Sequence, residues 1–100
     1  MRRVVPGVAV SEARAVLHMH YVYLLRSRPY SAQTYIGYTV DLKTRLQTHN
    51  AGGSIHTRRH LPWKLEGYLA FTDKYRALEF ERYLKSHSGQ VFAAKRLWPK

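Results

Sequence analysis

The sequence predicts a small α/β sandwich in which helices cover a three-stranded sheet, in the element order β-β-α-β-α-α. A length of 100 residues leaves room for one domain. The content of 45% apolar and 13% aromatic residues is enough to build a core at that length. Short runs of strand-forming residues are followed by stretches that begin at helix-capping aspartates, which indicates a mixed fold.

The predicted strands are three runs rich in tyrosine, valine, isoleucine and leucine. Residues 20–26 and 34–38 are two such runs, and the segment between them holds Pro29 and small polar residues. That spacing predicts a turn and an antiparallel β-hairpin. Residues 63–71 form the third predicted strand and complete the sheet.

Three helices are expected after the hairpin. The first spans 41–50 and the second 73–86, and each begins at an aspartate whose carboxylate can accept free amide hydrogens of the first turn. The last helix is expected over 90–97. Ser88-Gly89 should separate it from the second helix, because these residues disfavour a continuous helix.

Residues 1–18 show no firm hydrophobic period, and Pro6 and Gly7 interrupt them early. We therefore expect a mobile N-terminal extension, followed by a domain over residues 19–100. An added edge strand is the alternative for this segment. Its apolar residues would be Val4, Val5, Val8 and Val10.

Charge and composition narrow the range of partners. Seventeen Lys and Arg against six Asp and Glu give a net charge of +11, which favours nucleic acid first and an anionic membrane surface second. A basic surface that serves only solubility is the alternative. The absence of cysteine excludes disulfides and thiolate metal sites. Apolar runs are too short to span a bilayer, and Glu12 and Arg14 interrupt the first one, so we expect no signal peptide and a cytoplasmic protein.

Five short features in a fixed order resemble the GIY-YIG endonuclease domain, in particular its small stand-alone bacterial members. The similarity extends over residues 20–97 and is shared in part with structure-selective nucleases that cut branched DNA. The residues that carry it are Tyr21-Val22-Tyr23, Tyr35-Ile36-Gly37, Arg45, His49 and Glu81.

The resemblance implies a metal-dependent endonuclease that hydrolyses DNA phosphodiester bonds with Mg²⁺ or Mn²⁺. The sequence contains no recognisable motif for reading a DNA sequence, so cleavage should be structure-selective or weakly sequence-selective. The expected substrates are branched or flapped DNA that arises in repair or recombination. Two positions and one stretch depart from the family pattern: Tyr21 replaces a glycine, Tyr38 replaces a lysine of some relatives, and residues 88–94 lack an asparagine. A catalytically impaired nucleic-acid-binding module is therefore the alternative function, and adhesion of a basic protein to a membrane or ribosome is a weaker one.

Glu81 is the expected metal ligand. Its neighbours at helical spacing are the apolar residues Ala77, Leu78 and Leu84, so the carboxylate should face inward, where it needs a neutralising partner. A divalent cation would neutralise it and would share waters and phosphate oxygens. The alternative is an ordinary ion pair with Arg45 or a lysine.

The resemblance gives catalytic roles to Tyr23, Tyr35, Arg45 and His49. Arg45 can clamp the scissile phosphate through two guanidinium hydrogen bonds. Tyr23 is expected to be the general base and Tyr35 to orient water or phosphate, although the two roles are interchangeable. His49 lies four residues after Arg45 and could accept the tyrosine proton or bind a phosphate oxygen. Buried core tyrosines and a surface histidine are the alternatives.

A second group of residues is expected to contact nucleic acid. Gly37 lacks a side chain and could let substrate or a neighbouring backbone approach, or could mark a bulge. The loop before the third strand is rich in histidine and arginine and suits phosphate contacts. A solvated charged face is the alternative for these residues, which are Gly37, Tyr38, His56, Arg58, Arg59, Lys64 and Lys85.

Overall fold

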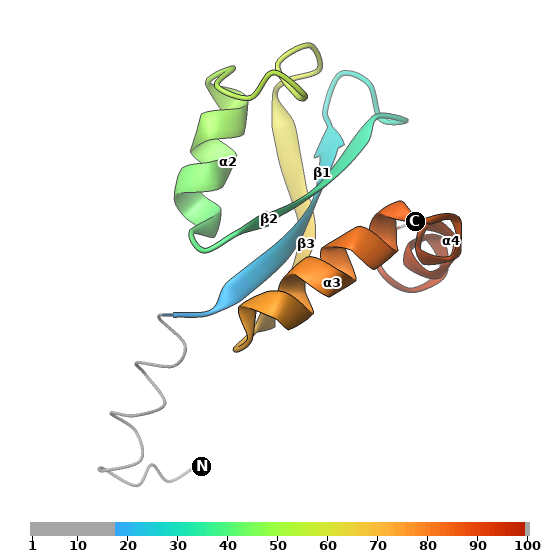
Figure 1. Ribbon diagram of the computed structural model, residues 1–100. Helices are drawn as coiled ribbons and strands as arrows, with labels where there is room; N and C mark the ends of the chain where they lie inside the picture. The colour runs from blue at the N-terminus through green and yellow to red at the C-terminus, as the bar shows by residue number, and fades with distance from the viewer. Residues whose placement is uncertain (1–17, 100) are drawn as a thin grey trace, which may run out of the picture.

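A computed structural model describes residues 18–99 and confirms the predicted class and element order. The predicted N-terminal extension lies outside the described residues, apart from His18. In chain order, the elements are β1 (His20–Ser27), β2 (Thr34–Thr39), α2 (Leu42–Asn50), β3 (Trp63–Phe71), α3 (Lys74–Lys85) and α4 (His87–Arg96) (Figure 1).

The sheet has the order β2-β1-β3, and both strand pairs are antiparallel. The central strand β1 is covered on both faces, so Val22, Leu24 and Leu25 are at most 2% exposed. This explains why β1 is a continuous apolar run instead of an alternating one. In the register, Tyr23 of β1 lies opposite Gly37 of β2, and this pairing positions the site described below.

Two small cores lie on the two faces of the sheet. Tyr23 and Leu25 point to the α2 side, where Leu46 packs against them. Val22 points to the other side and packs with Leu84 of α3 and other apolar residues of α3 and α4. Figure 1 shows α2 and the α3–α4 pair on opposite sides of the strands. Side chains of alternate residues in β1 therefore pack against different helices.

Both predicted aspartate caps are present. Asp41 Oδ1 accepts a hydrogen bond from the Thr44 amide (3.1 Å), and Asp73 Oδ2 accepts one from the Arg76 amide (3.2 Å). The backbone and side-chain hydrogen bonds from Thr44 lower the pKa of Asp41. The first cap sets where α2 starts, and so which of its residues face the sheet.

The predicted break at Ser88 and Gly89 is wrong, because α4 begins at His87 and includes both residues. The chain turns instead at Ser86, which is extended (φ −77°, ψ 165°) and whose Oγ accepts from the Gly89 amide at 3.1 Å. Gly89 is buried, and a Cβ there would overlap the backbone carbonyl of Tyr83. This glycine therefore permits close approach of α4 to the end of α3, and does not end a helix.

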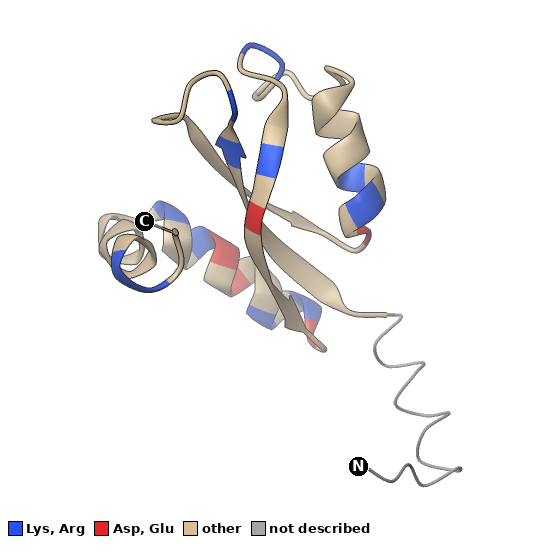
Figure 2. Ribbon diagram, turned by 180° about the vertical axis from the view of Figure 1, so that it is seen from behind, with Lys and Arg blue, Asp and Glu red and all other residues tan. Residues whose placement is uncertain are grey.

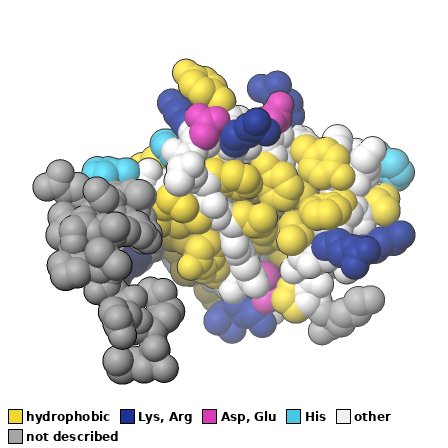
Figure 3. All heavy atoms as spheres, turned by 90° about the horizontal axis from the view of Figure 1, so that it is seen from below, with side chains coloured by type: hydrophobic (Ala, Val, Ile, Leu, Met, Phe, Trp, Pro, Cys, Tyr) yellow, Lys and Arg dark blue, Asp and Glu magenta, His cyan; other side chains and the backbone are white. Residues whose placement is uncertain are grey.

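Apolar side chains gather on the surface formed by α3 and α4 (Figure 3). They line a hollow of about 760 Å³ together with Arg76 and Glu79, and the apolar lining residues are Phe71, Phe80, Tyr83 and Phe92. Within residues 18–99, no helix has both the length and the apolar character needed to cross a membrane.

Candidate active site

Tyr23 lies at the centre of the candidate site. Its side chain is on the α2 face of β1, and the residue is only 2% exposed. The phenol ring crosses the neighbouring strand β2 at Gly37, where an added Cβ would overlap the ring and its hydroxyl. The motif glycine is therefore required because the tyrosine ring fills the space that a side chain would need.

Two residues of α2 contact the Tyr23 hydroxyl. The oxygen lies 2.8 Å from His49 Nε2 and accepts a hydrogen bond from Arg45 Nε at 3.3 Å. Their spacing of four residues places both side chains on the same helix face. His49 has no exposed surface, so the surface alternative does not describe this histidine.

Tyr35 of β2 completes the aromatic cluster. Its ring centroid lies 6.3 Å from that of Tyr23 and 5.2 Å from that of His49. In the strand register, Tyr35 pairs with Leu25, so the two phenols are diagonal neighbours and not directly opposed. Four of the five predicted site residues thus form one connected group.

Burial and charge determine the protonation states in this group. Burial raises the pKa of Tyr23 above 10.0, the hydrogen bond from Arg45 acts against this, and the charges of Tyr35 and Glu81 raise it further. The hydrogen bond to Tyr23 raises the pKa of Arg45. Burial, followed by the Arg45 charge, lowers the pKa of His49 below 6.5. At neutral pH the resting site therefore holds a neutral phenol and a neutral imidazole beside a charged guanidinium.

Glu81 reaches the same region from α3. Its Oε2 lies 2.6 Å from Lys85 Nζ, one helical turn away, and its side chain is 20% exposed. Lys85 Nζ in turn lies 5.9 Å from the centre of the Tyr35 ring. The carboxylate thus has a lysine partner, as the ion-pair alternative expected, and it is close enough to Tyr23 to contribute to that residue's raised pKa.

A metal at Glu81 would rest on one protein carboxylate. Among residues 18–99, no three His, Cys, Asp or Glu side chains gather in a way that could hold an ion. A partly exposed single carboxylate fits Mg²⁺, which usually keeps several waters and uses one or two carboxylates with substrate phosphates.

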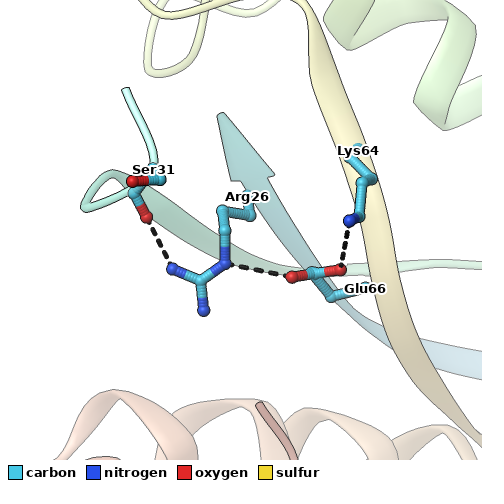
Figure 4. Close-up of polar contacts among 4 residues, drawn as sticks. All are labelled: Arg26, Ser31, Lys64 and Glu66. Carbon is cyan, nitrogen blue, oxygen red and sulfur yellow. Dashed lines mark hydrogen bonds and ion pairs between the residues drawn. The ribbon is translucent and has the colours of Figure 1, made fainter. Parts of the chain in front are cut away.

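Two of the predicted nucleic-acid contacts lie away from the phenol cluster. Tyr38 packs on the α3–α4 face, and its hydroxyl lies 2.7 Å from His20 Nδ1. Lys64 Nζ lies 3.4 Å from Glu66, which also accepts from Arg26 at 3.0 Å (Figure 4). Burial raises the pKa of Glu66, but the hydrogen bonds from Arg26 and Lys64 lower it overall. Lys64 therefore belongs to a network that links β1 and β3.

Of the remaining predicted contacts, Gly37 is buried beneath the Tyr23 ring, so it offers no surface to nucleic acid, whereas the others are exposed. His56, Arg58 and Arg59 lie in the loop between α2 and β3, and all three are accessible to solvent. Figure 2 shows Lys and Arg spread over strands, loops and helices, with few acidic segments between them. These residues offer positive charge for a polyanion without forming a single cluster.

Two further residues belong to the site and had no signal in the sequence. Thr57 is fully buried, and its Oγ1 lies 2.7 Å from His49 Nδ1. Gln90 of α4 lines a cavity of about 550 Å³ together with Tyr35 and Lys85, and its Nε2 donates to the Lys85 carbonyl at 3.2 Å. Thr57 lies in an irregular loop, where no periodicity marks a polar residue as buried.

Residues 19–95 match the family model of the GIY-YIG catalytic domain, and this range contains all five predicted site residues. The fold and this match define a small α/β nuclease domain, whose substrates are nucleic acids. The chain belongs to the GIY-YIG family, which confirms the resemblance found in the sequence.

Several bacterial proteins are similar to this chain. It is 43% identical over 70 residues to a UPF0213 protein of Bacillus licheniformis, covering 69% of this chain and 70% of the relative. A UPF0213 protein of Streptococcus pneumoniae is 44% identical over 69 residues, or 68% of each chain. One from Streptococcus pyogenes is 50% identical over 52 residues, or 51% of this chain and 56% of the relative. These names state no substrate and no metal.

Proposed function

We propose that this protein is a Mg²⁺- or Mn²⁺-dependent endonuclease that hydrolyses phosphodiester bonds in DNA, with residues 19–100 as the nuclease domain and residues 1–18 as an extension. The main support is the position of Tyr23, which is buried and held between a cationic donor and an imidazole. A phenol kept only for packing needs one hydrogen-bond partner for its buried hydroxyl. Two partners of different chemistry suit an oxygen that changes its protonation state.

In this proposal Tyr23 takes the proton of the attacking water and passes its own proton to His49 Nε2, 2.8 Å away. A neutral phenol is a poor base, so this transfer is what makes it effective. The negative charge of a bound phosphate would raise the pKa of His49, which burial and Arg45 keep low in the free protein. Substrate binding therefore favours the transfer.

Arg45 and Tyr35 position the substrate. The Nε of Arg45 is engaged with Tyr23, so its two terminal nitrogens remain for phosphate oxygens and for charge that develops in the transition state. Tyr35 lies beside both Tyr23 and Lys85 and orients the water or the phosphate. The exchange of roles between the two tyrosines is not favoured, because Tyr23 is the one that contacts both Arg45 and His49.

Glu81 would hold the metal ion, with waters and phosphate oxygens as its other ligands. The ion would act as a Lewis acid that stabilises the departing 3′ oxygen, which leaves a 5′-phosphate end. Neutralisation of the Glu81 charge would also remove one of the contributions that raise the pKa of Tyr23.

The DNA contacts are proposed to be mainly to phosphates. The net charge of +11 and the exposed Arg58 and Arg59 favour contacts that follow the backbone. The elements of residues 18–99 are all used to build the nuclease fold, with no added helix to read the major groove. Structure-selective or weakly sequence-selective cutting follows, with branched or flapped DNA as substrates to test.

A catalytically impaired DNA-binding module is the second candidate, because Glu81 forms an ion pair with Lys85, which competes with a metal ion for the carboxylate. Incubation of the protein with nicked, flapped, branched and plain duplex DNA, with and without Mg²⁺, separates the two. Glu81→Gln should abolish Mg²⁺-dependent products, whereas Glu79→Gln, an exposed change on the same helix, should leave them unchanged. Salt-sensitive DNA binding by the unmodified protein, with no products in any lane, would favour the second candidate.

A further inference from the structure

Thr57 lies in the loop between α2 and β3, yet it has no exposed surface. Its backbone is fixed from three directions: its amide donates to the Ser54 carbonyl (3.2 Å), and its carbonyl accepts from the His60 amide (3.1 Å) and from the Trp63 indole Nε1 (2.8 Å). A loop residue tied to the core in this way holds its side chain in one place. That side chain is a hydroxyl 2.7 Å from His49 Nδ1.

The partners of Tyr23 indicate which nitrogen of His49 carries the hydrogen. Arg45 can only donate, so the Tyr23 oxygen accepts from Arg45 and keeps its own hydrogen for another partner. The nearest acceptor is His49 Nε2 at 2.8 Å. A neutral imidazole has one donor and one acceptor nitrogen, so its hydrogen is on Nδ1, where it is donated to Thr57 Oγ1.

We propose that Thr57 is a positioning residue that holds His49 in the tautomer with hydrogen on Nδ1, so that Nε2 faces Tyr23 as a free proton acceptor. The proposal rests on the proposed function for its catalytic consequence but not for the tautomer itself. When the proton moves, the O–H bond of Tyr23 breaks and an N–H bond forms at Nε2. The resulting imidazolium then donates to both neighbours, and Thr57 Oγ1 accepts the Nδ1 hydrogen before and after the transfer.

Removal of this acceptor would allow the other tautomer. In Thr57→Val, a methyl group replaces the hydroxyl, and a hydrogen on Nδ1 would be buried without a partner. The hydrogen would move to Nε2, which would then donate to Tyr23 and could no longer accept its proton. We expect kcat to fall by about tenfold or more, the usual effect of removing one hydrogen bond to a buried group, with KM changed by less than about twofold.

Nuclear magnetic resonance of protein labelled with ¹⁵N-histidine tests the tautomer without any need for activity. The unmodified protein at neutral pH should show a protonated Nδ1 and an unprotonated Nε2 for His49, and Thr57→Ser should show the same. Thr57→Val should shift the population toward a protonated Nε2. Thr72→Val, at an exposed position outside the site, is the matched control and should change neither the spectrum nor kcat.

A protonated Nε2 in the unmodified protein would overturn the proposal, even if Thr57→Val does not fold. An unchanged tautomer in a folded Thr57→Val protein would overturn it as well. If the tautomers are as expected but no form of the protein cleaves DNA, the positioning role stands and the proposed function fails.

Discussion

Gly37→Ala tests the packing on which the site depends. The added Cβ would lie 2.9 Å from Tyr23 Cε2 and would overlap the hydroxyl end of the ring. Tyr23 is buried, so its ring cannot move aside without disturbing Leu25 and the α2 core. Overpacking of this kind costs about 1–3 kcal/mol. Loss of the hydrogen bond between Tyr23 and His49 would add about 1 kcal/mol, which gives a total of about 2–4 kcal/mol.

Urea unfolding measures this cost, and the chain provides a matched control. An added Cβ at Gly67 of β3 meets no atom within 4 Å, so Gly67→Ala should be neutral or should stabilise by up to about 1 kcal/mol, because it restricts the unfolded chain. The same assay can isolate the contact with a double-mutant cycle. In a Tyr23→Ala background the ring is absent, and Gly37→Ala should then cost less than about 0.5 kcal/mol.

Two results would refute the reasoning. One is a Gly37→Ala protein as stable as the unmodified one. The other is an equal cost of Gly37→Ala with and without the Tyr23 ring, which would assign the effect to the backbone of β2 and not to the phenol.

Three further predictions concern charge. Lys85→Ala should tighten Mn²⁺ binding, measured by calorimetry, by up to about fivefold. The reason is that the half-exposed Lys85–Glu81 ion pair, worth about 0.2–1 kcal/mol, competes with the metal ion for the carboxylate. Unchanged or weaker binding would contradict this. Burial lowers the pKa of His49 in the folded protein below the unfolded value of 6.5. As the pH falls, the unfolded chain therefore binds a proton at His49 before the folded protein does. Stability toward urea should be constant above pH 6.5 and should decrease below it. His49→Gln should weaken this acid dependence. Replacement of both Arg58 and Arg59 by Ala should reduce the slope of log binding constant against log salt by about 2, and an unchanged slope would remove them from the DNA interface.

Local signals in the sequence predicted most of the fold. The strand runs and the two aspartate caps depend on neighbouring residues only, so they could be identified without knowledge of tertiary contacts. The role of Gly89 cannot be predicted from its neighbours in sequence, because it depends on the backbone of Tyr83, which Gly89 meets only after α4 packs against α3. A glycine needed for helix contact and a glycine that ends a helix look the same in a sequence.

The site was predicted less completely than the fold. The motif pattern pointed to Tyr23, Arg45 and His49, which the structure brings into contact. It did not point to Thr57, because the contact of Thr57 with His49 depends on the conformation of the loop between α2 and β3. A loop has no hydrophobic period from which its conformation could be predicted. It also left open whether Glu81 meets a metal ion or pairs with a basic side chain, and the structure places Lys85 Nζ 2.6 Å from its carboxylate.

The central claim is that the Tyr23 hydroxyl takes part in Mg²⁺-dependent hydrolysis of DNA. The most direct measurement compares single-turnover cleavage by the unmodified protein and by Tyr23→Phe, with DNA affinity and urea stability measured on the same samples. The account predicts a folded variant that binds DNA normally and cleaves it at least about 100-fold more slowly, as expected when a general base is removed. A Tyr23→Phe protein that cleaves at the unmodified rate would contradict the account.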